Sequence, residues 1–190
     1  MAKNNHARHA VLSELPAFDS EGDLRVVIET PKGSQNKYKY DPQCDCLELK
    51  TSLPAGMSFP YDFGFIPSTL GQDGDPVDVL VLMDTAVIAG CVITARAIGI
   101  IEAEQKEEGK DWERNDRVLA VAVHSRSHAK TKIIKDLRPH LMDEITAFFV
   151  DYNELHGKKF KPLGTHGPGN ALDHIEEGCR AYKSKRKKKK

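Results

Sequence analysis

The sequence predicts an α+β fold that is mainly β, in which a small barrel of strands is packed by helices. Short segments rich in β-branched residues occur up to about residue 124, turn residues separate them, and two helical patterns follow. A chain of 190 residues suits one domain, because a chain of about this length buries roughly 70% of its unfolded surface. We expect one domain over residues 1–182 and a basic tail over 183–190.

Strands are predicted wherever β-branched residues and partial alternation coincide. Six segments meet this description: 24–30, 37–41, 47–51, 77–83, 91–103 and 117–124. They precede both helical patterns, so the helices are expected to pack on a barrel that the strands have formed.

Two helices are predicted after the strands. Pro139 opens the first, and its apolar residues recur at helical spacing: Leu141, Ile145, Phe148, Tyr152 and Leu155. Asn170 is the expected N-cap of the second. One face of that helix carries Leu172, Ile175, Cys179 and Tyr182.

The cysteines and the apolar segments bear on the compartment. Cys44, Cys46, Cys91 and Cys179 are too few and too scattered for a disulfide framework, and no second pair completes a zinc site. We expect four free thiols. No apolar run approaches the ~20 residues of a membrane helix, and residues 1–17 do not form a charged-then-apolar leader. A cytoplasmic protein without membrane contact is expected.

The net charge of zero hides an uneven distribution. Residues 183–190 carry seven basic side chains, which leaves 21 basic against 28 acidic residues in the rest of the chain. Because like charges repel, we expect this tail to be disordered and solvated. Contact with nucleic acid or with another acidic partner is the alternative.

The segment Asp73-Gly-Asp-Pro-Val-Asp78 places three carboxylates within six residues, directly before an apolar run. Carboxylates this close repel one another, and shared divalent cations such as Mg²⁺ relieve the repulsion. An ordinary turn before a strand is the alternative. An EF-hand loop is disfavoured, because Asp78 and Asp84 stand where that loop needs Gly and Glu.

The sequence around this cluster resembles the signature region of soluble family I inorganic pyrophosphatases. The resemblance rests on Phe59-Pro-Tyr-Asp-Phe-Gly-Phe-Ile-Pro67 and Asp73-Gly-Asp-Pro-Val-Asp-Val-Leu-Val81, and extends from about residue 26 to 161. Further matching parts are Val26-Val-Ile-Glu-Thr-Pro31, Asn36-Lys-Tyr38 and Phe148-Phe-Val-Asp-Tyr152. The resemblance implies a five-stranded OB-like barrel flanked by helices, with its active site at one end. It also implies a cytoplasmic homo-oligomer that hydrolyses pyrophosphate to two phosphates with Mg²⁺.

The resemblance assigns roles to particular residues. Asp75 would orient or deprotonate the attacking water. Several Mg²⁺ ions, or Mn²⁺ or another divalent ion instead, would lower the pKa of that water. The metal ligands would be Asp73, Asp78, Glu29, Glu107 and Asp116. The substrate-binding residues would be Lys37, Lys50, Arg117 and Tyr152.

Some positions depart from the usual family pattern. Lys39 stands where many members carry Glu, Lys50 where Arg is common, Phe63 where Tyr is usual, and Asn153 where Lys is usual. Residues 107–117 form a longer segment than the family's, so either Asn115 or Asp116 could align with a metal-binding Asp. These departures keep two alternatives open: a hydrolase of another phosphoanhydride, such as polyphosphate or a nucleotide, and an inactive interaction protein with the same fold.

Overall fold

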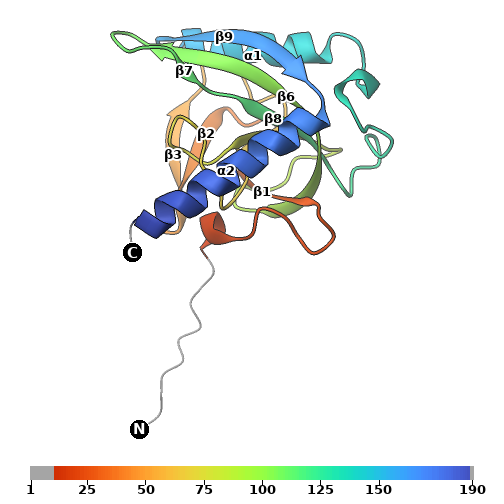
Figure 1. The fold of residues 1–190 in the computed structure, drawn as a ribbon. Coiled ribbons are helices and arrows are strands. Elements are labelled where there is room, and N and C mark those ends of the chain that lie inside the picture. Colours follow the sequence, from red (N-terminus) through yellow and green to blue (C-terminus); the bar gives the residue numbers. More distant parts are fainter. Residues whose placement is uncertain (1–10, 189–190) are drawn as a thin grey trace.

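Five strands form a closed ring in the computed structural model, which describes residues 11–188 (Figure 1). Neighbouring strands pair in the order β1-β4-β5-β8-β6, and β6 pairs with β1 to close the ring. The β5–β8 pair is parallel, and the other four pairs are antiparallel. The ring strands are β1 (Leu24–Thr30), β4 (Asp62–Phe65), β5 (Asp78–Leu82), β6 (Val92–Glu107) and β8 (Arg117–Ala122). The prediction of a mainly β fold with five ring strands is confirmed.

Further short elements extend the ring. The hairpin of β2 (Asn36–Asp41) and β3 (Cys46–Ser52) forms a separate two-stranded sheet. β7 (Glu113–Arg114) and β9 (Lys158–His166) both pair with the long strand β6. Of two 3₁₀ helices, η1 (Leu12–Glu14) precedes β1, and η2 (Ile134–Asp136) follows β8.

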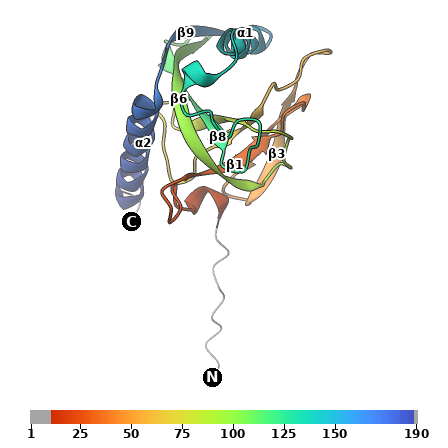
Figure 2. The ribbon, with the colours of Figure 1, turned by 90° about the vertical axis from the view of Figure 1, so that its right-hand side faces the viewer.

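Two α-helices cover the ring. α1 (Leu141–Glu154) contacts β9, and α2 (Pro168–Lys188) contacts β6. Figure 2 shows α2 along one side of the ring and α1 beside β9 at one end. α2 begins at Pro168, two residues before the expected cap at Asn170, because proline suits the first helical position.

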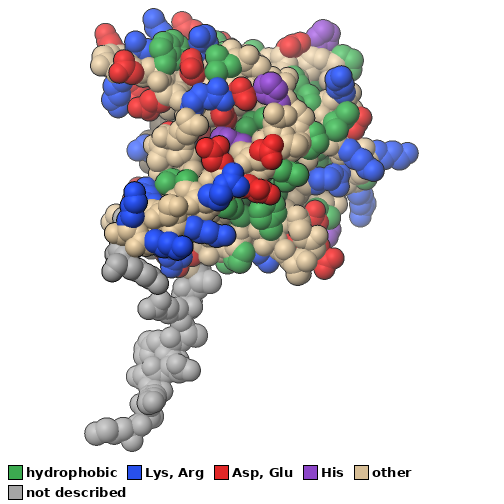
Figure 3. All heavy atoms as spheres, in the orientation of Figure 1, with side chains coloured by type: hydrophobic (Ala, Val, Ile, Leu, Met, Phe, Trp, Pro, Cys, Tyr) green, Lys and Arg blue, Asp and Glu red, His purple; other side chains and the backbone are tan. Residues whose placement is uncertain are grey.

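The C-terminal basic residues differ from their expected disorder. α2 continues to Lys188, and only residues 189–190 of the predicted tail lie outside the described residues. The basic side chains of the last turn face the negative end of the helix dipole, and Arg186 Nη2 lies 3.1 Å from Glu14 Oε1. In Figure 3, basic side chains gather over the C-terminal end of α2.

The ring strands are buried on both faces, which explains their nearly continuous apolar runs. Alternate residues of β5 and β8 enter two core clusters. One cluster includes Ala171 and Ile175 of α2, and the other includes Ile145 and Phe149 of α1. The two helices therefore fix the ring from opposite faces of the same strands.

Three strands were not predicted from the sequence. β4 has only four residues, including Gly64, whose missing Cβ allows close approach of the Val27 backbone. β7 has two residues, and β9 contains Pro162 and Gly164, which are both uncommon inside strands.

The four cysteines are free, as expected. Among the described residues, no helix combines the length and apolar character needed to span a membrane.

Candidate active site

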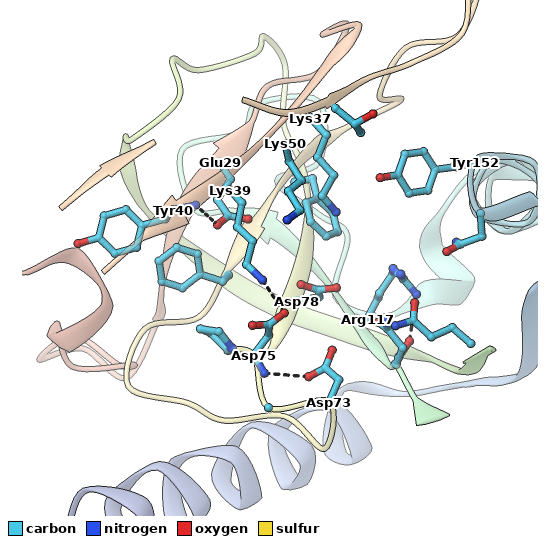
Figure 4. Close-up of a pocket in the computed structure, with 18 of the residues that line it drawn as sticks. Glu29, Lys37, Lys39, Tyr40, Lys50, Asp73, Asp75, Asp78, Arg117 and Tyr152 are labelled. Carbon is cyan, nitrogen blue, oxygen red and sulfur yellow. Dashed lines mark hydrogen bonds and ion pairs between the residues drawn. The ribbon is translucent and has the colours of Figure 1, made fainter. Parts of the chain in front are cut away.

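A cavity of about 500 Å³ lies where the ring meets the β2–β3 hairpin and α1 (Figure 4). Eight of the ten residues that the resemblance assigned to the site line this cavity. The acidic ones are Glu29, Asp73, Asp75 and Asp78, and the others are Lys37, Lys50, Arg117 and Tyr152. They come from segments between residues 29 and 152, so the fold itself assembles them.

The acidic loop, residues 69–77, is shaped by its own backbone contacts. Gly71 N–H donates to Asp75 O (2.7 Å), and Val77 N–H donates to Thr69 Oγ1 (2.9 Å). Gly74 has a φ of 87°, a conformation that glycine adopts without steric cost. Asp78 then begins β5 and pairs in register with Arg117 of β8. The loop thus presents Asp73 and Asp75 beside Asp78 at the cavity wall.

Three of the cavity carboxylates, Glu29, Asp73 and Asp78, have raised pKa values. Burial raises the pKa of Asp78, although Arg117 and Lys37 oppose the shift. Burial and the neighbouring Asp78 raise the pKa of Asp73 to about 6, even though Asp73 lies at the exposed rim. Burial raises the pKa of Glu29 to about 7, despite a hydrogen bond of 2.7 Å from Tyr40 N–H. A cation bound between these groups would stabilise their charged forms.

Lys39 forms an ion pair with the acidic loop. Its Nζ lies 2.6 Å from Asp75 Oδ2, and the two side chains are 43% and 51% exposed. Burial lowers the pKa of Lys39, but the hydrogen bond to Asp75 and the nearby carboxylates outweigh it, so that pKa is raised. Asp75 N–H also donates to Asp73 Oδ1 (3.1 Å), which orders the loop further.

Two cations are held against aromatic rings on another part of the wall. Lys37 Nζ lies 4.6 Å from the centre of the Phe63 ring and 5.6 Å from that of Tyr152. The Arg117 guanidinium carbon lies 4.2 Å from the ring centre of Phe149. Burial lowers the pKa of both Lys37 and Arg117. An anion in the cavity would compensate for their lost hydration.

Arg117 and Tyr152 both have hydrogen-bonding groups suited to such an anion. Arg117 Nη1 donates to Asn115 O (3.0 Å), and its buried Nε has no hydrogen-bond partner among the described residues. Burial raises the pKa of Tyr152, so its hydroxyl remains a neutral donor near pH 7. Lys50 adds an exposed cation from β3.

Glu107 and Asp116 do not line the cavity. Glu107 is paired with Lys110 at 2.5 Å and with Lys158 at 2.6 Å. Asp116 is nearly buried, where it accepts hydrogen bonds from Ala103 N–H (2.9 Å) and Arg114 Nη2 (2.8 Å). The two positions left open by the sequence are therefore separated: Asn115 lines the cavity, and Asp116 supports the strands beside it.

Some cavity residues were missed or only noted as departures. Lys39, Phe63 and Asn153 all line the cavity, as does Lys158. Asn153 uses its Nδ2 to donate to Phe149 O (2.8 Å), so that group is engaged within α1. No sequence signal marked Lys158, because the strand that carries it was not predicted. The alternation of β2, which places Lys37 and Lys39 on one face, could have identified Lys39.

The fit of a divalent cation depends on the chemistry of the donor set. Among residues 11–188, no group of three or more His, Cys, Asp or Glu side chains is arranged to hold a metal ion. The cavity nevertheless offers four carboxylates, and hard divalent cations prefer such oxygen ligands. Burial raises the pKa of Glu29, Asp73 and Asp78 despite the neighbouring cations, so a further positive charge among them would stabilise their ionised forms. The residues present therefore fit Mg²⁺.

Comparisons with known proteins agree with this geometry. A family model described as inorganic pyrophosphatase matches residues 26–183. The chain is 41% identical over 172 residues to an inorganic pyrophosphatase of Synechocystis sp., covering 90% of this chain and 99% of the relative. It is 37% identical over 178 residues to that of Thermus thermophilus, covering 92% of this chain and 99% of the relative.

Solved structures give the same result. The crystal structure of the inorganic pyrophosphatase from Thermus thermophilus superposes with a TM-score of 0.84 and 34% identity, covering 92% of this chain and 99% of that one. The inorganic pyrophosphatase from Helicobacter pylori gives a TM-score of 0.79 at 32% identity, covering 92% and 96% of the two chains.

Proposed function

The chain belongs to the inorganic pyrophosphatase family, and we propose that it hydrolyses inorganic pyrophosphate to two phosphates. The proposal rests on the presence of both acidic and basic side chains in one cavity. Four carboxylates, Glu29, Asp73, Asp75 and Asp78, line the same cavity as five cationic side chains and the Tyr152 phenol. The cations are Lys37, Lys39, Lys50, Lys158 and Arg117. A small polyanion requires the cations, and the metal ions that accompany it require the carboxylates.

Asp73, Asp78 and Glu29 are the proposed ligands of Mg²⁺, with Mn²⁺ as a possible replacement. When bound, such ions neutralise charge on phosphate oxygens and lower the pKa of a coordinated water. Glu107 and Asp116 receive no direct role, because neither lines the cavity and both are engaged in ion pairs. Asn115, which does line the cavity, offers an amide oxygen instead.

Asp75 is the proposed general base. Its side chain is 51% exposed, so water can reach it. Pro76 fixes its own φ and biases Asp75 towards extended backbone, which limits the positions that the carboxylate can take. In the reaction, Asp75 orients the attacking water and accepts one of its protons as the water oxygen bonds to one phosphorus. The bridging P–O bond breaks, and the other phosphate leaves with the bridging oxygen.

The remaining polar residues hold the substrate. Arg117 can donate two parallel N–H groups to phosphate oxygens, whereas Lys37 and Lys50 contribute single charged donors. The Tyr152 hydroxyl donates one neutral hydrogen bond. Because Lys37 and Arg117 rest on aromatic rings, their charges are positioned before the substrate arrives.

The direct test compares phosphate release from pyrophosphate, tripolyphosphate and ATP at equal concentrations, with and without Mg²⁺. Fast, Mg²⁺-dependent release selective for pyrophosphate is the expected result. Preference for tripolyphosphate or ATP would instead support a hydrolase of another phosphoanhydride. Absence of release with Mg²⁺, Mn²⁺ or Zn²⁺ would support an inactive interaction protein.

Assembly and compartment are also proposals. Self-association is supported by exposed apolar side chains, which include Ile88, Leu163 and Leu172. Light scattering across protein concentrations would measure it. A cytoplasmic location is supported by the exposed free thiols of Cys44 and Cys46, which suit a reducing compartment. Fractionation of cells that express the full chain would test this location.

A further inference from the structure

Lys39 differs from the other cavity cations in what it contacts. Lys37 and Arg117 lie against aromatic rings, whereas Lys39 extends from β2 to the acidic loop and meets Asp75 (Figure 4). Among the described residues, Lys39 is the only side chain that donates a hydrogen bond to the Asp75 carboxylate. Its partner is thus the proposed general base.

The position of Lys39 follows from the strand that carries it. Side chains two residues apart on a strand share a face, so Lys37 and Lys39 both turn towards the cavity that they line. Glu29 and Asp78 as well as Asp75 contribute favourable charge at Lys39. The ammonium therefore lies among the carboxylates, in the field where a bound cation would be most favourable.

The pair is also labile. Both side chains are about half exposed, and ion pairs of this kind contribute little net stability. A lysine stem is flexible and its ammonium is a compact point charge. Lys39 can therefore leave Asp75 when a cation of higher charge enters.

We propose that the Lys39 ammonium acts as a built-in cation of the carboxylate cluster, which competes with divalent ions and sets the affinity of the substrate-free protein for Mg²⁺. The proposal rests on the proposed function, because it assumes that these carboxylates bind divalent cations. Lys39 thus lowers the metal affinity of the cluster. Its removal frees Asp75 and withdraws one positive charge from the cluster.

The test measures Mn²⁺ binding to the full chain without pyrophosphate, by isothermal titration calorimetry and by the electron paramagnetic resonance signal of free Mn²⁺. Lys39→Met removes the charge and keeps a similar stem, whereas Lys39→Arg keeps the charge. The matched control is Lys161→Met, because Lys161 also pairs with a carboxylate, that of Glu104 (3.6 Å), but does not line the cavity.

Lys39→Met is expected to bind Mn²⁺ about tenfold more tightly than the wild type, since one charge within a few ångströms changes carboxylate proton affinity by about this factor or more. Lys39→Arg and Lys161→Met should match the wild type. If the wild type binds Mn²⁺ and Lys39→Met binds it with an affinity within twofold of wild type, the proposed role of Lys39 is overturned and the metal site is not. The proposed metal site requires that the wild type bind Mn²⁺ and that Asp78→Asn abolish this binding. If the wild type shows no such binding, both the metal site and the role of Lys39 are overturned.

Discussion

Leu70 N–H donates to the backbone oxygen of Gly178 at 3.0 Å, so the C-terminal helix is bonded directly to the acidic loop. Gly178 permits this approach because it has no side chain. A Cβ there would lie 2.9 Å from Val77 Cγ2 and 3.2 Å from Thr69 Cβ. Helix α2 therefore supports the loop that carries Asp73 and Asp75.

Gly178→Val should move α2 away from the acidic loop and lower both stability and turnover. Overpacking a tight contact costs about 1–3 kcal/mol, which chemical denaturation would measure. Gly169→Val is the matched control, because Gly169 lies in the same helix and a Cβ at that position would meet no atom within 4 Å. Equal stability and equal kcat in the two variants would contradict a supporting role for the contact.

Arg117 is predicted to bind the substrate and to contribute little to the free energy of unfolding. Replacing it by Met removes charged donors and should lower kcat/KM by about 10- to 100-fold, since hydrogen bonds to charged groups contribute about 1.5–3 kcal/mol. Arg117→Lys should retain part of the activity, because it keeps the charge and loses the two parallel donors.

The stability of the same Arg117 variants separates binding from folding. The Arg117 guanidinium lies over the rings of Phe149 and Phe160, and a Met side chain can keep apolar contact with both. We expect Arg117→Met to unfold at a denaturant concentration close to that of the wild type. If kcat/KM stays within twofold of wild type, Arg117 does not bind the substrate.

The metal-free protein should lose stability as pH rises through the range in which Glu29 titrates. The folded-state pKa of Glu29 is raised from 4.5 to about 7. Its neutral form is therefore favoured by folding, and this contribution is complete below pH 4.5 and lost as pH rises through about 7. Glu29→Gln should match wild type near pH 4 and exceed it by up to about 3 kcal/mol near pH 8.

Urea denaturation in the presence of a chelator would measure this difference, with Glu48→Gln as an exposed control on β3. Added Mg²⁺ should reduce the advantage of Glu29→Gln, because a divalent ion stabilises the charged carboxylate. A gap between wild type and Glu29→Gln that does not change with pH would show that Glu29 titrates normally in the folded protein.

The sequence was most informative where a pattern is local. The carboxylate spacing of Asp73, Asp75 and Asp78 is visible within six residues. The apolar runs of β5 and β8 predicted the strands that begin with Asp78 and Arg117. The alternation of β2 is equally local. The pattern predicted a strand at 37–41, and Lys37 of that strand lines the cavity.

Features that depend on distant pairing were not predictable from such patterns. Asp116 is adjacent to Asn115 in sequence, but hydrogen bonds from Ala103 N–H and Arg114 hold its carboxylate outside the set of residues that line the cavity. Glu107 forms an ion pair with Lys158 of β9. That strand was not predicted, because it contains Pro162 and Gly164. The Lys39–Asp75 contact joins residues 36 positions apart, and only the folded chain reveals it.

The central claim, that Asp75 accepts a proton from the attacking water, is tested most directly by Mg²⁺-dependent phosphate release from pyrophosphate by the wild type and Asp75→Asn. Asn keeps the size of the side chain and removes its basicity. We predict rapid release by the wild type and a loss of about 10²- to 10⁴-fold in kcat for Asp75→Asn. In a separate titration, Asp75→Asn should still bind Mn²⁺. Turnover by Asp75→Asn within a few-fold of wild type would contradict the account.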